Sequence, residues 1–167
     1  CKIISKAESK GIAPGTFKLV FTKKNFIRKL GEHENITSMG NDEVNFVVTV
    51  ENTQDILIFT TMGKVFKLPV SKIPLYAKGS NGIDVRILNK YITSNIVCAA
   101  STDTIDRLIK GKKFKSYIFI VTRKGFIKKM DLDDIVNAVP SGIIYSKLDE
   151  GDYVKDIIFG PDKLDLL

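Results

Sequence analysis

The chain has few side chains that could carry out acid–base or metal chemistry. His33 is the single histidine among 167 residues, so a nucleophile paired with a base would depend on it alone. Cys1 and Cys98 are the two cysteines, and with one histidine they do not make a zinc site. Cys98 lies in the apolar run Ile-Val-Cys-Ala-Ala, which is typical of a small core residue. We therefore expect no catalytic site, no metal and no cofactor in this chain.

Two short segments have the composition of ligand-binding loops without the spacing. Gly-Ser-Asn-Gly at 79–82 lacks the spacing of a phosphate-binding loop, and Asp-Leu-Asp-Asp at 131–134 lacks the other ligands of a calcium-binding loop. We interpret Asp131, Asp133 and Asp134 as turn formers.

Basic side chains offer the clearest binding chemistry. The 26 Lys and Arg residues outnumber the 19 Asp and Glu residues, which gives a net charge of +7 and a pI near 9.3. This balance favours a polyanionic partner, nucleic acid before an acidic membrane. The residues that we expect to contact such a partner are Lys23, Lys24, Arg28, Lys29, Lys64, Lys67, Lys78, Arg123, Lys124, Lys128 and Lys129.

Most of these cations lie on three segments that have the pattern of β-hairpins. The segments are residues 18–30, 56–68 and 118–130, each with an apolar run, a turn and a second run. Aligned, they share threonines (Thr22, Thr60, Thr122), turn residues (Asn25, Gly63, Gly125), apolar residues (Ile27, Val65, Ile127) and lysines (Lys29, Lys67, Lys129). Three unrelated hairpins would not be expected to agree at all four positions, so we interpret the pattern as an internal repeat.

The segments around the hairpins extend the repeat. Residues 56–59 are all apolar, which indicates a strand covered on both faces. Residues 44–50 are rich in β-branched residues and predict a further strand. Glycine-bearing loops at 76–83 and 137–143 lead to predicted apolar strands at 83–88 and 143–148, and last strands are predicted at 95–100 and 153–159. Four short strands in a unit is the makeup of a propeller-type blade.

The second unit carries an insertion at residues 101–115. Ile105, Leu108 and Ile109 have helical spacing after Asp103, a candidate helix cap, so a short helix is predicted. The cluster Lys110, Lys112, Lys113 and Lys115 follows, and it is interpreted equally well as a solvated loop or as a phosphate contact.

The chain is long enough for one domain with a sizeable core. Residues 1–16 have no clear periodicity and are interpreted as a lead-in, and residues 17–167 as the domain. Asp165-Leu166-Leu167 repeats the entry to the central hairpin, so we expect a fragment of a longer repeat array. No apolar run reaches the ~20 residues that a membrane-spanning helix needs, no signal peptide is visible, and the cytoplasm is the expected compartment.

The hairpin repeat, the turn Pro-Val-Ser-Lys-Ile-Pro, the loop Ala-Lys-Gly-Ser-Asn-Gly-Ile and the ending Asp-Glu-Gly-Asp-Tyr-Val-Lys-Asp-Ile resemble one family. It is the C-terminal domain of the A subunits of bacterial type IIA DNA topoisomerases, DNA gyrase and topoisomerase IV. The resemblance covers residues 17–167. It implies an all-β, propeller-like β-pinwheel of repeated four-stranded antiparallel blades, about three in this fragment.

The same resemblance implies a function. The outer rim of such a domain binds and bends duplex DNA, and its partners are the ATPase subunit of the enzyme and the remainder of the A subunit, in the cytoplasm on the nucleoid. The resemblance also implies that the DNA-cleaving tyrosine of the ATP-dependent parent isomerase lies upstream. No tyrosine of this chain follows an arginine, the pairing expected around that nucleophile. The tyrosines are Tyr76, Tyr91, Tyr117, Tyr145 and Tyr153.

One departure from the family bears on how DNA would be handled. Gyrase carries a glutamine-arginine-glycine-lysine box in the loop after the first hairpin. The corresponding loop of this chain, residues 31–43, is short and acidic and lacks that box. The resemblance therefore favours a topoisomerase IV-like domain, or a divergent phage or plasmid relative, that bends DNA without wrapping it as gyrase does.

Other interpretations stay open at this point. If the hairpins stack side by side, their equivalent cations form one exposed basic stripe along a rim, which suits a DNA backbone. Lysines at hairpin turns also protect sheet edges, so such a stripe need not be a DNA footprint. The alternative from another functional class is a propeller-like protein-interaction module. Salt dependence distinguishes the two, because binding through several phosphates weakens steeply with salt and an apolar protein interface does not.

Overall fold

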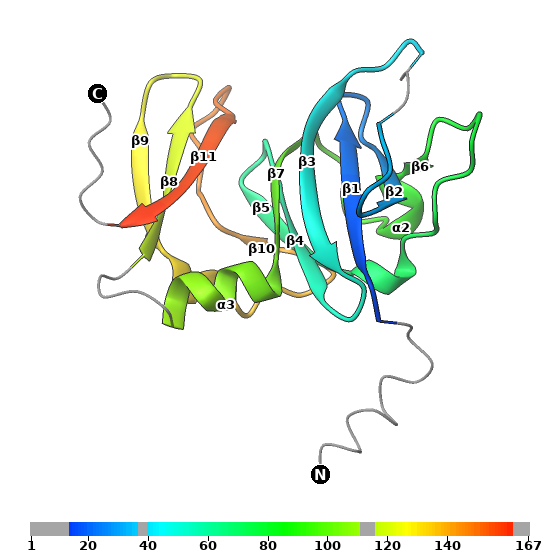
Figure 1. Ribbon diagram of the computed structural model, residues 1–167. Helices are drawn as coiled ribbons and strands as arrows, with labels where there is room; N and C mark the ends of the chain where they lie inside the picture. Colours follow the sequence, from blue (N-terminus) through cyan, green and yellow to red (C-terminus); the bar gives the residue numbers. More distant parts are fainter. Residues whose placement is uncertain (1–13, 37–39, 111–115, 162–167) are drawn as a thin grey trace.

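The computed structural model describes residues 14–36, 40–110 and 116–161 and contains three antiparallel sheets, here called blades, set side by side (Figure 1). Blade 1 has the strand order β3-β1-β2-β6, blade 2 β10-β5-β4-β7 and blade 3 β11-β8-β9. The strands are β1 (Thr16–Thr22), β2 (Phe26–Gly31), β3 (Val44–Glu51), β4 (Asp55–Thr60), β5 (Lys64–Pro69), β6 (Ile83–Asp84), β7 (Ile96–Ser101), β8 (Ser116–Thr122), β9 (Ile127–Asp131), β10 (Ile143–Ile144) and β11 (Val154–Pro161). The helices are η1 (Val70–Lys72), α2 (Val85–Leu88), α3 (Thr102–Lys110) and η2 (Leu132–Ile135). The all-β, propeller-like architecture is confirmed.

The three predicted hairpins form the centres of the blades, as β1–β2, β4–β5 and β8–β9. Their turn residues all have positive φ, 64° at Asn25, 78° at Gly63 and 91° at Gly125. Only glycine and, to a lesser degree, asparagine adopt this conformation readily, which is why these types recur there. The repeated threonines close the turns through their hydroxyls. Those of Thr22 and Thr122 accept the amide protons of Phe26 and Phe126, and that of Thr60 donates to the Lys64 carbonyl.

Each of the first two blades takes its fourth strand from the following repeat. β6 lies after the second hairpin in sequence but pairs with β2, and β10 lies after the third hairpin but pairs with β5. The prediction that each unit supplies all four of its own strands is therefore wrong. The predicted strands over 83–88 and 143–148 are also too long, because pairing ends after two residues and α2 follows β6 directly. In the described part of the chain, blade 3 has three strands.

The glycine-bearing loops allow this exchange because they pass very close to the preceding hairpin. A Cβ on Gly82 would lie 2.7 Å from the Ile27 carbonyl oxygen, and a Cβ on Gly142 would lie 2.5 Å from the Phe66 ring. Both glycines also have positive φ, 95° and 92°. A larger residue at either position would push the exchanged strand away from its partner.

The hydrophobic cores lie between the blades. One contains Leu19, Phe21 and Ile27 of blade 1 with alternate residues of β4 and β5, and the other contains Leu57, Phe59 and Val65 of blade 2 with residues of blade 3. Side chains of a strand point alternately to the two faces of its sheet, so β4 supplies residues to both cores. This confirms the prediction that residues 56–59 are covered on both faces.

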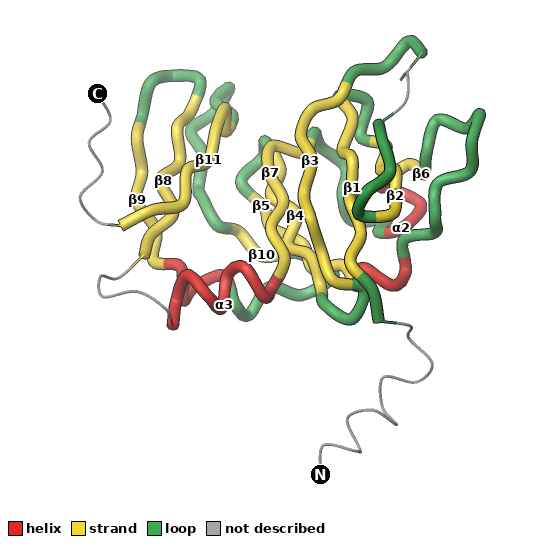
Figure 2. The backbone as a smooth tube through the Cα atoms, viewed as in Figure 1, coloured by secondary structure: helices red, strands yellow, loops and turns green. Residues whose placement is uncertain are grey.

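The insertion forms α3, which runs along one end of blades 2 and 3 (Figures 1 and 2). Its first turn is capped by Ser101, whose hydroxyl accepts the Thr104 amide proton at 3.1 Å. The cap is therefore Ser101 rather than Asp103, which instead pairs with Arg107 at 2.8 Å. The predicted short helix is confirmed, and it buries Ile105. Lys110 ends the helix, and Lys112, Lys113 and Lys115 lie outside the described residues.

The blades have an inner and an outer edge. β7 contacts both β3 and β11, so these three strands converge on the inner side. The exchanged strands β6 and β10 lie at the opposite edge of their sheets, on the outer side. No helix within the described ranges is long and apolar enough to cross a membrane.

Candidate nucleic-acid interface

The three hairpin turns lie at the same end of the stacked blades, opposite α3 (Figure 1). Lys23 and Lys24 follow β1, Lys64 begins β5, and Arg123 and Lys124 follow β8. All five side chains are exposed. The blade repeat thus places cationic groups at regular positions on one end of the domain.

Arg28 and Lys29 do not join this surface. Arg28 is 3% exposed, with its guanidinium carbon 4.7 Å from the centre of the Tyr76 ring. Lys29 is 5% exposed, and its ammonium donates to the Asn52 side chain at 2.6 Å and the Val70 carbonyl at 3.2 Å. Burial lowers the pKa of Lys29. The expectation of one exposed basic stripe is corrected for these two residues, whose contacts hold blades and loops together.

The repeated lysines each contact the residue at one equivalent position of the facing strand. The Lys29 ammonium lies 4.6 Å from the centre of the Phe17 ring, and that of Lys129 lies 4.6 Å from the centre of the Tyr117 ring. Lys67 instead pairs with Asp55 at 3.5 Å. Lys129 is exposed and Lys67 is half-buried, so the repeated lysine is an internal contact in the first blade and a surface group in the third.

The remaining predicted residues lie on the surface with contacts of their own. Lys124 donates from its ammonium to the Glu150 carbonyl at 2.6 Å, and Lys128 donates to the Lys147 carbonyl. Lys78 is exposed on the glycine-bearing loop at 76–83. A contact between any of these cations and DNA stays a prediction.

Two aspartates clamp the first and third hairpin turns. Asp42 accepts the Lys24 amide proton at 3.2 Å, and Asp152 accepts the Lys124 amide proton at 3.0 Å. Burial by itself raises the pKa of each carboxyl, but hydrogen bonds from Thr22 or Thr122 and from neighbouring amides outweigh it and lower both pKa values. Asp42 is thus a structural acid of the turn.

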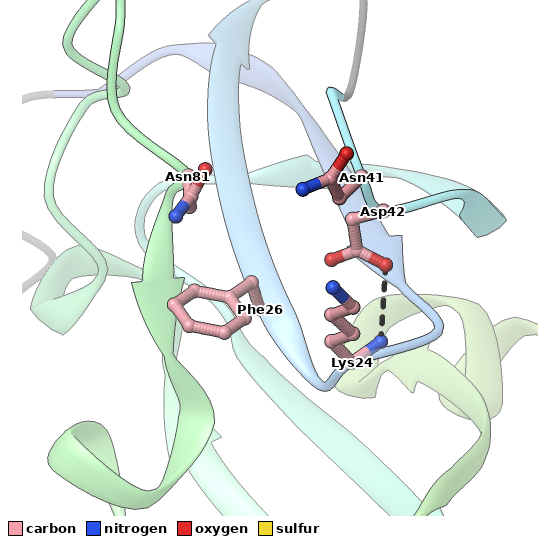
Figure 3. Close-up of a pocket in the computed structure, with 5 residues that line it drawn as sticks. All are labelled: Lys24, Phe26, Asn41, Asp42 and Asn81. Atoms are coloured by element: carbon pink, nitrogen blue, oxygen red, sulfur yellow. Dashed lines mark hydrogen bonds between the residues drawn. The ribbon is translucent and has the colours of Figure 1, made fainter.

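A small cavity of about 140 Å³ opens beside the first clamp (Figure 3). Its lining joins three segments distant in sequence, and the residues are Lys24, Phe26, Asn41, Asp42 and Asn81. The cavity has room for several water molecules. Because Asn81 belongs to the glycine-bearing loop at 76–83, this loop completes the surface around the first hairpin turn.

Sequence reasoning missed the clamps and part of the outer edge. Asp-Glu-Val at 42–44 and Asp-Tyr-Val at 152–154 are the signal that could have revealed the clamps. Exposed cations also follow the exchanged strands. They are Arg86 and Lys90 after β6 and Lys147 after β10, with Arg86 held by Asp84 at 2.7 Å.

Burial disfavours ionisation of two potential nucleophiles in the described part of the chain, Cys98 and Tyr145. Burial raises the pKa of the Cys98 thiol to about 11 and also raises the pKa of Tyr145, whose hydroxyl donates to the Thr60 carbonyl at 2.7 Å. No group of three or more potential metal ligands occurs among the residues that the structure describes.

Sequence comparison finds one family and its members. The family model for the DNA gyrase C-terminal domain, a β-propeller, matches residues 54–85 and 116–159. The A subunit of DNA gyrase from Leptospira biflexa is 30% identical over 134 residues, which cover 80% of this chain and 15% of that protein. The corresponding gyrase protein of Treponema pallidum is 26% identical over 124 residues, which cover 73% of this chain and 14% of that protein. The chain spans about 15% of the length of such relatives.

Solved structures share the fold. The C-terminal domain of DNA topoisomerase IV superposes with a TM-score of 0.68 at 17% identity, over 89% of this chain and 47% of that chain. The DNA gyrase A C-terminal domain gives a TM-score of 0.56 at 16% identity, over 88% of this chain and 48% of that chain. The repeated hairpins, the blades and both sets of relatives agree. The chain therefore belongs to the family of C-terminal domains of type IIA DNA topoisomerase A subunits.

Proposed function

We propose that this domain binds duplex DNA through its phosphates, without reading sequence, and bends it. The observation that carries the proposal is the placement of exposed cations on successive hairpin turns at one end of the stacked blades. Phosphates recur regularly along a duplex, and a repeated set of cations matches them without base contacts. The net charge of +7 also favours binding to a polyanion such as DNA.

The parent protein in this proposal is an ATP-dependent type IIA topoisomerase of the cytoplasm, acting on the nucleoid. The domain would work with an ATPase subunit of the enzyme and with the remainder of its own polypeptide. Family membership supports this assignment, and the chemistry of strand passage would lie elsewhere in the parent protein.

Within the family, we propose that this domain handles DNA more as the topoisomerase IV domain does than as the gyrase domain does. The loop after the first hairpin lacks the gyrase box and carries Glu32, Glu34 and Glu43, all exposed. Smooth bending through 40–90° costs on the order of 1–6 kcal/mol, so a full wrap needs additional phosphate contacts. Acidic groups there would repel a returning duplex, and the domain bends DNA without constraining strong positive writhe.

A charge-reversal pair tests DNA binding. The variant Lys64→Glu/Arg123→Glu/Lys124→Glu changes the turn end, and Lys72→Glu/Arg107→Glu/Lys110→Glu makes the same charge change at the end that carries α3. We expect the first triple variant to lose most of its affinity for linear duplexes of unrelated sequence, with a flatter dependence on salt. Equal losses from both variants would contradict a footprint on the turns.

A ligation experiment tests the mode of bending. Nicked plasmid is sealed with saturating protein, the protein is removed, and the linking-number shift is read on a gel. We expect a small shift, and a large positive shift per bound domain would contradict the topoisomerase IV-like proposal.

Protein binding is the second candidate function. Phe126 and Ile127, at the edge of β9, are 49% and 60% exposed and would suit an apolar partner. Complex formation that persists at high salt, without DNA affinity, would favour this alternative.

A further inference from the structure

The turns of blades 1 and 3 share a backbone frame made by equivalent pairs of residues. The Lys23 amide donates to the Glu43 carbonyl and the Arg123 amide to the Tyr153 carbonyl, both at 2.9 Å. The amides of Glu43 and Tyr153 donate in turn to the clamp aspartates Asp42 and Asp152, at 2.8 and 2.9 Å. The first cation of each turn therefore lies beside the residue that follows the clamp.

The two turns differ in the chemistry of that neighbouring residue. In blade 1 the Lys23 ammonium is paired with the Glu43 carboxylate at 2.9 Å, with exposed side-chain fractions of 60% and 73%. In blade 3 the Arg123 guanidinium carbon lies 5.8 Å from the centre of the Tyr153 ring. An acid in one repeat thus corresponds to an aromatic residue in the other.

We propose that the residue after each clamp sets the strength of its turn as a phosphate contact, so that Glu43 weakens the turn of blade 1 and Tyr153 strengthens that of blade 3. This inference rests on the proposed binding of duplex DNA. It makes Glu43 a built-in competitor of phosphate for Lys23. It also makes Tyr153 a positioning residue for Arg123.

The physical reason is competition at one site and orientation at the other. A phosphate that reaches Lys23 has to displace a carboxylate already within hydrogen-bond distance. A guanidinium held over an aromatic ring by a cation–π contact is restricted in orientation, while its N–H groups can still donate to a phosphate. Exposed ion pairs are weak, so the effect of Glu43 is an attenuation of affinity, about two- to fivefold.

Two glutamates of equal charge allow a matched test on the whole chain. Glu43→Gln removes the competitor of Lys23, whereas Glu32→Gln removes an exposed acid whose carboxylate lies 3.8 Å from the His33 imidazole. Binding of a linear duplex is measured by fluorescence anisotropy between 50 and 200 mM salt, a range of about fourfold that resolves the slope of log K against log salt. Thermal melts check that both variants fold.

The expected result is a difference in slope as well as in affinity. Glu43→Gln should raise affinity about two- to fivefold and steepen the slope by about 0.9, the value for one additional phosphate contact. Glu32→Gln, which removes only general repulsion of the duplex, should raise affinity less and leave the slope unchanged. The reverse exchange, Tyr153→Glu, should lower affinity and flatten the slope by about the same amount.

Two negative outcomes are distinguishable. Salt-dependent binding with identical slopes for Glu43→Gln and Glu32→Gln, and no change for Tyr153→Glu, would overturn this inference alone. Absence of salt-dependent binding by the unaltered chain would overturn the proposed function, and the inference with it.

Discussion

The outer edges of blades 2 and 3 are built from equivalent hairpins but have different surroundings. In blade 2, Val65 pairs with Ile143 of the exchanged strand β10 and is fully buried. In blade 3 the equivalent Ile127 is 60% exposed, and β8 is the one partner of β9 among the residues described. Blade 1 resembles blade 2, because β6 covers Ile27. One repeated apolar residue therefore becomes core or surface according to whether a strand from elsewhere in the chain pairs with its hairpin.

Truncation of the repeated apolar residue should give the largest contrast. Ile27→Ala removes a side chain that is 1% exposed and should cost about 2–5 kcal/mol of unfolding free energy. Ile127→Ala should stay within about 0.5 kcal/mol, because the side chain is already in water. Urea unfolding followed by circular dichroism measures both. Equal losses would show that the edge of β9 is covered in solution.

The turn glycines should give the next contrast. Gly63→Ala would place a Cβ 2.1 Å from the Ser146 carbonyl oxygen, whereas a Cβ on Gly125 meets nothing within 4 Å. Both substitutions carry the cost of positive φ, about 1–2 kcal/mol. For Gly63→Ala alone, displacement of the segment around Ser146 should add about 1–3 kcal/mol to the loss of unfolding free energy. Similar melting temperatures for the two variants would contradict the close approach.

Loss of one hydroxyl should test how the exchanged segment is tied to blade 2. Tyr145→Phe removes the donor to the buried Thr60 carbonyl and should cost about 1–3 kcal/mol, since the carbonyl loses its partner. Tyr153→Phe, at a half-exposed tyrosine that follows the clamp of blade 3, is the control and should be nearly neutral. A neutral Tyr145→Phe variant would mean that water or another group replaces the hydroxyl.

The smallest effect is expected for the reactivity of Cys98, which reports how tightly blade 3 packs against blade 2. Burial raises its pKa to about 11, so the thiolate is scarce at pH 7 and its fraction increases as the pH rises toward that value. In a Cys1→Ser background, alkylation by iodoacetamide at pH 7 should be slow and should accelerate with pH. Rapid alkylation at pH 7 would show that blade 3 separates from blade 2.

Much of the fold was predictable because its determinants are local. Three of these determinants lie within a single hairpin. They are a turn residue that tolerates positive φ, a threonine four residues before the amide that it accepts or faces, and an apolar run of strand length. The last strands at 95–100 and 153–159 were also predicted to within a residue or two of β7 and β11. The candidate site was predictable to the same extent, since Lys23, Lys24, Lys64, Arg123 and Lys124 lie on hairpin turns.

The partners of each element depended on distant residues and could not be predicted. A strand of two residues, such as β6 or β10, has no periodicity, and its pairing with the preceding hairpin is decided by a loop that fits closely over it. Lys29 appeared as one more surface lysine. Its burial follows from Asn52 and Val70, which are 23 and 41 residues away in sequence.

The hairpins, their turns and the basic residues on them thus follow from short stretches of sequence, because backbone conformation and hydrophobic alternation are set by neighbouring residues. Tertiary structure alone decided which strand completes each blade, which cations stay exposed and which acids clamp the turns. These outcomes depend on burial and on hydrogen bonds between segments that meet only in the folded chain.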